Sequence, residues 1–92
     1  MMKHMLAVVM DGIKDTGMLA GYAEDAKAHD AEHSVVAWFK TRAQSRLGMI
    51  ERDWHDVDDE LRMHKKDDDL LDALECHVNR SLSELKMRID KV

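Results

Sequence analysis

The chain has 92 residues, of which 45% are apolar and 36% are charged, with a net charge of −5 and no proline. This size corresponds to one domain, and this balance is typical of a folded helical protein, which excludes a disordered chain. Residues 51–72 carry ten acids against four bases. Because such an acidic segment repels phosphate, we expect no direct binding to nucleic acid or to an anionic membrane.

The cysteine content and the N-terminal region bear on location. Cys76 is the only cysteine, so no disulfide can form within the chain and nothing in the sequence indicates an oxidising compartment. The apolar run from Met5 to Met10 is too short for a secretory signal, and Asp11 ends it without a small-residue cleavage site. No segment approaches the ~20 apolar residues that span a bilayer. We therefore expect a cytoplasmic protein.

The first helix is expected over residues 2–28. Residues in steps of four and three form one stripe along it: Met2, Leu6, Val9, Ile13, Thr16, Ala20 and Ala23. Three glycines, Gly12, Gly17 and Gly21, each cost about 1 kcal/mol relative to alanine, so they either break the helix or let another helix approach closely. Gly12 falls roughly level with Gly48 across the first turn. We predict one continuous helix.

The second helix is expected over residues 31–63, with Asp30 as its N-terminal cap. It carries a stripe with the same steps: Val36, Phe39, Ala43, Leu47, Ile50, Trp54, Val57 and Leu61. The sequence HKKDDD at residues 64–69 then places bases at the end of this helix and acids at the start of the next. Both placements favour the helix dipoles, so a turn is expected here.

The third helix is expected over residues 68–91. Its stripe completes the set: Leu71, Leu74, Val78, Leu82, Leu85, Ile89 and Val92. Three such stripes can be buried only against one another, and the short connections make neighbouring helices antiparallel. We therefore predict an all-α fold, an antiparallel up-down bundle of three long helices in a single domain covering residues 1–92.

The helix lengths also predict an assembly. With equal rise per residue, Val92 reaches only about the level of residue 41, so the first turn and its flanking helices should project as a two-helix hairpin. Four apolar residues lie there, off the main stripes: Leu19, Tyr22, Val35 and Trp38. Because a monomer seldom leaves such a patch in water, we predict a homodimer that buries it across a two-fold axis in a dimeric helical bundle. The alternative is that the third helix bends over, or that the helix ends differ, so that the patch is covered within one chain.

The corner between the first two helices holds the candidate metal ligands. Asp25, His29 and His33 would share one face of an unbroken helix, and Glu32 lies beside them. The expected break at Asp30 disrupts that register. Ferritin-like di-iron bundles place Glu-x-x-His motifs on two helices, and this chain contains none, so any likeness is one of helical architecture only. We expect no cofactor, with a metal ion at this corner as the alternative.

The motifs of the common enzyme classes are absent from the sequence. It has no phosphate-binding glycine loop, no Cys-x-x-Cys pair, no zinc-protease helix motif and no serine nucleophile elbow. We therefore predict a non-enzymatic interaction or regulatory module that acts as a homodimer. Two alternatives remain open. One is a metal-binding bundle that uses the Asp/Glu/His corner of two subunits, and the other is an acidic mimic or antagonist that presents residues 51–72 to a basic partner.

Overall fold

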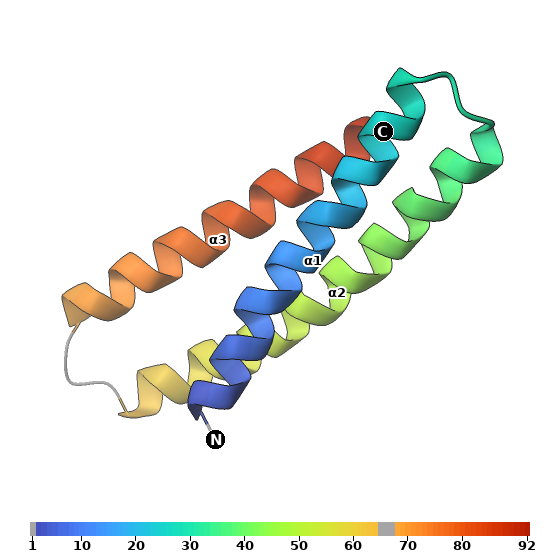
Figure 1. Cartoon of the computed structure of the whole chain (residues 1–92). Helices are drawn as coiled ribbons and strands as arrows, with labels where there is room; N and C mark the ends of the chain where they lie inside the picture. The colour runs from blue at the N-terminus through green and yellow to red at the C-terminus, as the bar shows by residue number, and fades with distance from the viewer. Residues whose placement is uncertain (1, 65–67) are drawn as a thin grey trace.

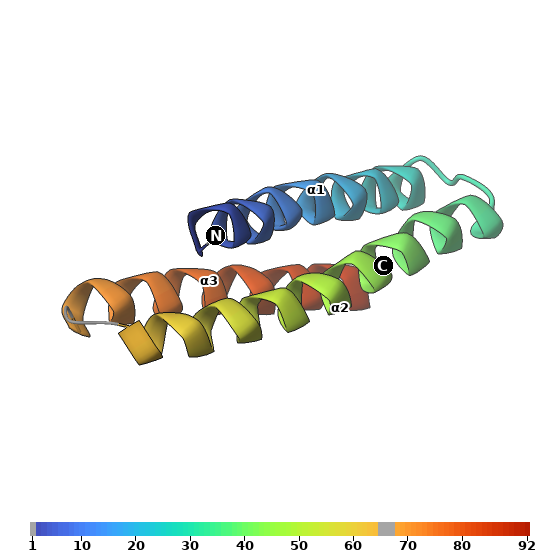
Figure 2. The ribbon, with the colours of Figure 1, turned by 90° about the horizontal axis from the view of Figure 1, so that it is seen from below.

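The computed structural model describes residues 2–64 and 68–92, which form three α-helices. These are α1 (Met2–Ala28), α2 (His33–His64) and α3 (Asp68–Lys91). α1 and α3 run in one direction and α2 runs in the other, in an elongated bundle of 51 × 22 × 14 Å (Figure 1). Figure 2 shows α1 as one layer lying over a second layer made by α2 and α3. The predicted all-α three-helix bundle is confirmed.

The three predicted stripes form the core. One cluster of buried side chains joins all three helices: Val9, Ala20, Ala43, Leu47, Ile50, Trp54, Val57, Val78, Leu82, Leu85 and Ile89. Steps of three and four keep these side chains on one side of each helix, so every turn adds a contact to the same core. Leu61 and Leu74 pack against the cluster but are only partly buried. The side chain of Met2, the first predicted stripe position, lies outside the described residues.

α1 is continuous through its three glycines, as predicted. Gly12 marks a close approach of two helices, because a Cβ atom there would lie 2.8 Å from Cγ1 and 2.9 Å from Cδ1 of Ile50. Gly48, which the sequence places level with Gly12, has no heavy atom within 4 Å of such a Cβ. The close approach of α1 and α2 is therefore made by a glycine under a large side chain, not by two facing glycines.

Asp30 ends α1 and does not cap α2, so that prediction is wrong. Its φ of 54° lies in the left-handed region, which aspartate enters more readily than most residues. The N–H of Ala31 donates to the carbonyl of Ala26 at 2.9 Å, and the N–H of Asp30 donates to that of Lys27 at 3.2 Å. This pair of bonds is the Schellman termination, in which the left-handed residue satisfies the last carbonyls of the helix.

α2 begins at His33, two residues after its predicted start. The carbonyl of Glu32 accepts from the N–H groups of Val35 at 3.0 Å and Val36 at 3.3 Å, so Glu32 occupies the capping position instead of Asp30. At the other end α2 extends one residue beyond its predicted end. The charges of the second turn, residues 65–67, lie outside the described residues.

Polar contacts hold α3 in place against both other helices. The indole N–H of Trp54 on α2 donates to Oδ1 of Asn79 on α3 at 3.0 Å. Arg88 on α3 donates to both carboxylate oxygens of Glu24 on α1, from Nε at 3.1 Å and from Nη2 at 2.6 Å. These hydrogen bonds hold the pKa of Glu24 below its ordinary value and raise the pKa of the Arg88 guanidinium. The contact at Arg88 fixes how far α3 reaches along α1.

Candidate interaction surface

Three of the four aromatic side chains of the chain gather where α1 ends and α2 begins. The ring centroids of Tyr22 and Phe39 are 5.7 Å apart, and those of Trp38 and Phe39 are 5.0 Å apart in an edge-to-face arrangement. The guanidinium carbon of Arg42 lies 4.6 Å from the centroid of the Trp38 ring, within the range of a cation–π contact. We call Tyr22, Trp38 and Phe39 the aromatic cluster.

The structure places three of the four predicted patch residues in water. Tyr22 is 49% exposed, Val35 is 42% exposed and Trp38 is 53% exposed. Leu19 differs, because it is partly buried and packs against the core. Phe39, which the stripe pattern assigns to the core, is only half-buried, and it joins Tyr22 to Trp38. The only feature of the sequence that points to Phe39 as a member of an aromatic cluster is its position next to Trp38.

The predicted reason for the exposure, a third helix that ends level with residue 41, is wrong. Nζ of Lys27 donates to the carbonyls of Lys91 at 3.1 Å and Val92 at 3.4 Å, and Val92 lines a hollow with Val36, so α3 reaches the last turn of α1 and the first turn of α2. Arg88 of α3 also binds Glu24, and its Nη2 lies 3.9 Å from a Cβ built at Gly21, so α3 covers α1 around Tyr22. Tyr22 is exposed because successive residues of a helix are turned by ~100°, which points it away from α3. The direction in which the side chains point, more than the length of α3, leaves the patch exposed.

The same side of the α1–α2 pair continues toward the other end of the bundle as a groove of about 260 Å³. Its lining mixes apolar and charged side chains: Val8, Asp11, Gly12, Asp15, Arg46, Met49, Ile50 and Asp53. Nη2 of Arg46 lies 3.1 Å from Oδ2 of Asp15, an ion pair across the two helices. Such an exposed pair adds little stability, but it shows that Asp15 and Arg46 lie at the same level of α1 and α2. We call the groove and the aromatic cluster together the open face.

The candidate metal ligands are not brought together. Asp25, His29, Glu32 and His33 are all exposed, and α1 ends before His33, so the shared helical face is lost. Within residues 2–64 and 68–92, no group of three or more His, Cys, Asp or Glu side chains is placed to hold a metal ion. The left-handed turn at Asp30 is the physical reason, because it redirects the chain between the two histidines.

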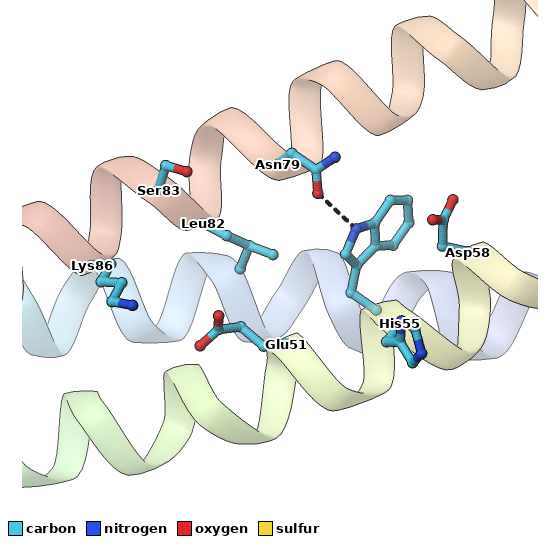
Figure 3. A pocket seen from close by; sticks show the side chains of 8 residues that line it. Glu51, His55, Asp58, Asn79, Leu82, Ser83 and Lys86 are labelled. Atoms are coloured by element: carbon cyan, nitrogen blue, oxygen red, sulfur yellow. Dashed lines mark hydrogen bonds between the residues drawn. The ribbon is translucent and has the colours of Figure 1, made fainter.

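A second hollow, of about 460 Å³, lies between α2 and α3 (Figure 3). It is lined by Glu51, Trp54, His55, Asp58, Asn79, Leu82, Ser83 and Lys86. Figure 3 shows Asp58 and Asn79, which accepts from the indole N–H of Trp54, toward one end of the hollow and Glu51 and Lys86 toward the other. Carboxylates and an ammonium group share this open lining, so it presents no single charge to a ligand.

Two carboxyl groups meet beside this hollow, near the ends of α2 and α3. Arg62 pairs with both of them, through Nε to Asp58 at 3.7 Å and through Nη2 to Glu75. Asp58 Oδ1 and Glu75 Oε1 are buried and find no hydrogen-bond partner among the described residues. Burial, and then the neighbouring Asp58 carboxyl, raise the pKa of Glu75 above its ordinary value, and Arg62 offsets this only in part.

The raised pKa of Glu75 makes a prediction about stability. The folded chain holds the Glu75 proton more tightly than the unfolded chain, so this contribution is complete below pH 4.5 and is lost as the pH rises through the raised pKa. Glu75→Gln should therefore be more stable than the natural chain at neutral pH and should lose this part of the pH dependence. Urea unfolding from about pH 4 to pH 8 measures the difference.

Glu84→Gln is the matched control, because Glu84 is an exposed carboxylate on the same helix. It should follow the natural chain across the whole pH range. Destabilisation on acidification from the Glu24–Arg88 pair is common to all three proteins, so it cancels in the comparison. Identical pH profiles for Glu75→Gln and the natural chain would contradict the prediction.

No protein-family model, curated protein or solved structure matches this chain. Among the helices of the described residues, none has the length and apolar character that a membrane span requires.

Apolar content distinguishes the open face from the rest of the described surface. The described residues expose ten large apolar side chains. Six of these lie on the open face of α1 and α2: Val8, Met18, Tyr22, Val35, Trp38 and Met49. A grouped set of this kind marks an interaction surface.

Proposed function

We propose that this chain is a small non-enzymatic interaction module that works as a homodimer through its open face. The observation that supports this most directly is the aromatic cluster, in which Trp38 and Tyr22 are each about half exposed. Single exposed apolar residues are ordinary, but tryptophan, tyrosine and arginine grouped together are the residue types enriched at the centre of protein interfaces. Trp38, Tyr22 and Arg42 supply all three.

A second copy is the occupant that this surface fits best. In a two-fold dimer the same patch is used twice, so each aromatic cluster covers the other and both leave water. The aromatic cluster and the groove both lie along the α1–α2 pair of an elongated molecule, so two copies can meet along this side of their bundles. Cys76 is free and exposed, which suits the reducing cytoplasm that we propose as its location.

Trp38→Glu is the direct test of this proposal. In the dimer the substitution would bury an unpaired charge, whereas in the monomer it only exposes that charge to water. We expect a species of half the mass in analytical ultracentrifugation, with the helical circular dichroism retained. Met87→Glu is the control, because Met87 is similarly exposed but lies on α3 between the buried Leu85 and Ile89.

Two outcomes would overturn the proposal. The first is a natural chain that remains monomeric at about 100 μM, where a stable dimer would be almost fully formed. The second is a dimer that survives Trp38→Glu with unchanged affinity, which would place the interface elsewhere on the molecule. Dissociation by Met87→Glu as well as by Trp38→Glu would likewise contradict a specific role of the open face.

A further inference from the structure

The open face carries a second, exposed stripe on each of its two helices. On α1 the stripe follows steps of three and four: Val8, Asp11, Asp15, Met18 and Tyr22. On α2 it follows Val35, Trp38, Arg42, Arg46, Met49 and Asp53. From the aromatic cluster as far as Asp15 and Arg46 in the groove, the charge on the α1 stripe is therefore acidic and the charges on the α2 stripe are basic, whereas Asp53 at the end of the α2 stripe is acidic.

Two contacts fix how these stripes lie relative to each other. Asp15 lies level with Arg46, since their side chains pair at 3.1 Å. Tyr22 lies level with Phe39, since their rings are 5.7 Å apart. Acidic and basic positions thus face each other at one level, and the aromatic residues of both helices meet at another level two turns away.

We propose that the second copy docks on the open face with the two-fold axis parallel to the helices, so that α1 of each chain covers α2 of the other at the same level. This inference rests on the proposed homodimer and specifies how its surface is used. Tyr22 then packs on Trp38 and Phe39 of the second copy. Asp15 faces Arg46 of the second copy, so two Asp15–Arg46 pairs join into a ring of four alternating charges that closes the interface.

The opposite orientation is disfavoured by charge. A two-fold axis across the helices would place α1 on α1 of the second copy, where the only charged residues that Asp15 could meet on the same stripe are acidic, and it would place Arg42 and Arg46 on the basic residues of the second α2. Like charges brought together at an interface cost affinity and serve to exclude wrong arrangements. Asp11 and Asp53, both acidic and at the far end of the groove, mark where the parallel interface ends and the surface stays in water.

Charge reversal tests this pairing. Asp15→Arg and Arg46→Asp should each weaken dimerisation by about ten-fold or more, because like charges then meet across the interface. Each reversal also breaks the exposed pair within its own chain, so the two variants are then mixed in equal amounts. In the mixed dimer, arginine at position 15 of one chain meets aspartate at position 46 of the other, and the remaining Asp15 meets Arg46. Native mass spectrometry on mass-tagged chains measures the amounts of the mixed dimer, of the two unmixed dimers and of the monomers.

The mixing experiment separates this inference from the proposed function. A mixed dimer about ten-fold tighter than either variant alone supports the charge ring, because the pairs within each chain stay broken. A natural chain that dimerises, with mixed and unmixed variants of equal affinity, overturns the charge ring and leaves the homodimer standing. A natural chain that is monomeric overturns both.

Spin labels test the direction of the axis. A nitroxide at Met63→Cys, in a Cys76→Ser background, marks the end of α2 that lies far from the aromatic cluster. The parallel dimer places both labels at one end, at a separation well below the 51 Å length of the molecule. An antiparallel dimer centred on the aromatic cluster places them on opposite sides of it, at or beyond that length. Pulsed electron paramagnetic resonance distinguishes the two, and the long distance would overturn the proposed orientation.

Discussion

Ile50→Ala should lower the free energy of unfolding by about 2–5 kcal/mol, among the largest effects of any single substitution in this chain. Ile50 is 5% exposed and belongs to the core cluster that joins all three helices. It also covers Gly12 of α1, so truncation leaves a cavity that the neighbouring backbone cannot easily fill. Leu74→Ala should cost less, because Leu74 only packs against the edge of the core.

Urea unfolding followed by circular dichroism measures both values, at one protein concentration because dimerisation would add to the apparent stability. Met63→Ala is the control on the same helix, since Met63 is 81% exposed. It should change the free energy of unfolding by less than about 0.5 kcal/mol. An Ile50→Ala effect no larger than that of Met63→Ala would show that α1 and α2 do not pack through this residue.

The helices and the core could be predicted from the sequence because both depend on one strong periodic signal. Side chains such as Val9, Val57 and Ile89 recur in steps of three and four over long segments, and a stripe of that length has few ways to be buried. α1 stays helical through three glycines for the same reason. Their propensity cost of about 1 kcal/mol each is smaller than the burial gained along the whole helix.

The periodic pattern of apolar residues could not show whether Asp30 caps α2 or ends α1. A short polar side chain suits both the N-terminal cap of a helix and the left-handed residue that ends one. The sequence around residues 29–33 offers acids and histidines for either arrangement. What decides between them is the pair of backbone hydrogen bonds from Asp30 and Ala31 back into α1, which depends on the direction of the departing chain.

The sequence predicted three residues of the candidate surface, but it did not predict how α1, α2 and α3 lie relative to that surface. Tyr22, Val35 and Trp38 lie off the core stripes, and that alone predicts their exposure. Which side of the α1–α2 pair α3 would cover was not encoded in helix lengths, because three helices can pack with either hand. The pairing of Asp58 with Glu75 was missed for a related reason, since it joins two helices whose relative rotation no local pattern specifies.

Gly12→Ala should destabilise the fold, although alanine is the better helix former. Propensity alone would stabilise α1 by about 1 kcal/mol, but the added Cβ would lie 2.8 Å from a side-chain atom of Ile50. Either Ile50 leaves its position in the core or the helices separate, and overpacking of this kind costs about 1–3 kcal/mol. Gly48→Ala is the matched control, because the space around a Cβ there is open, and it should stabilise the fold.

The sign of the Gly12 effect should depend on Ile50. In the Ile50→Ala background both crowding atoms are gone, so Gly12→Ala should become neutral or stabilising and the two substitutions should not be additive. A double-mutant cycle of unfolding free energies measures this coupling, with Gly48→Ala in the same background expected to keep its original effect. Additive values for Gly12→Ala and Ile50→Ala would mean that the two residues do not touch, and the level of α1 against α2, on which the open face depends, would be wrong.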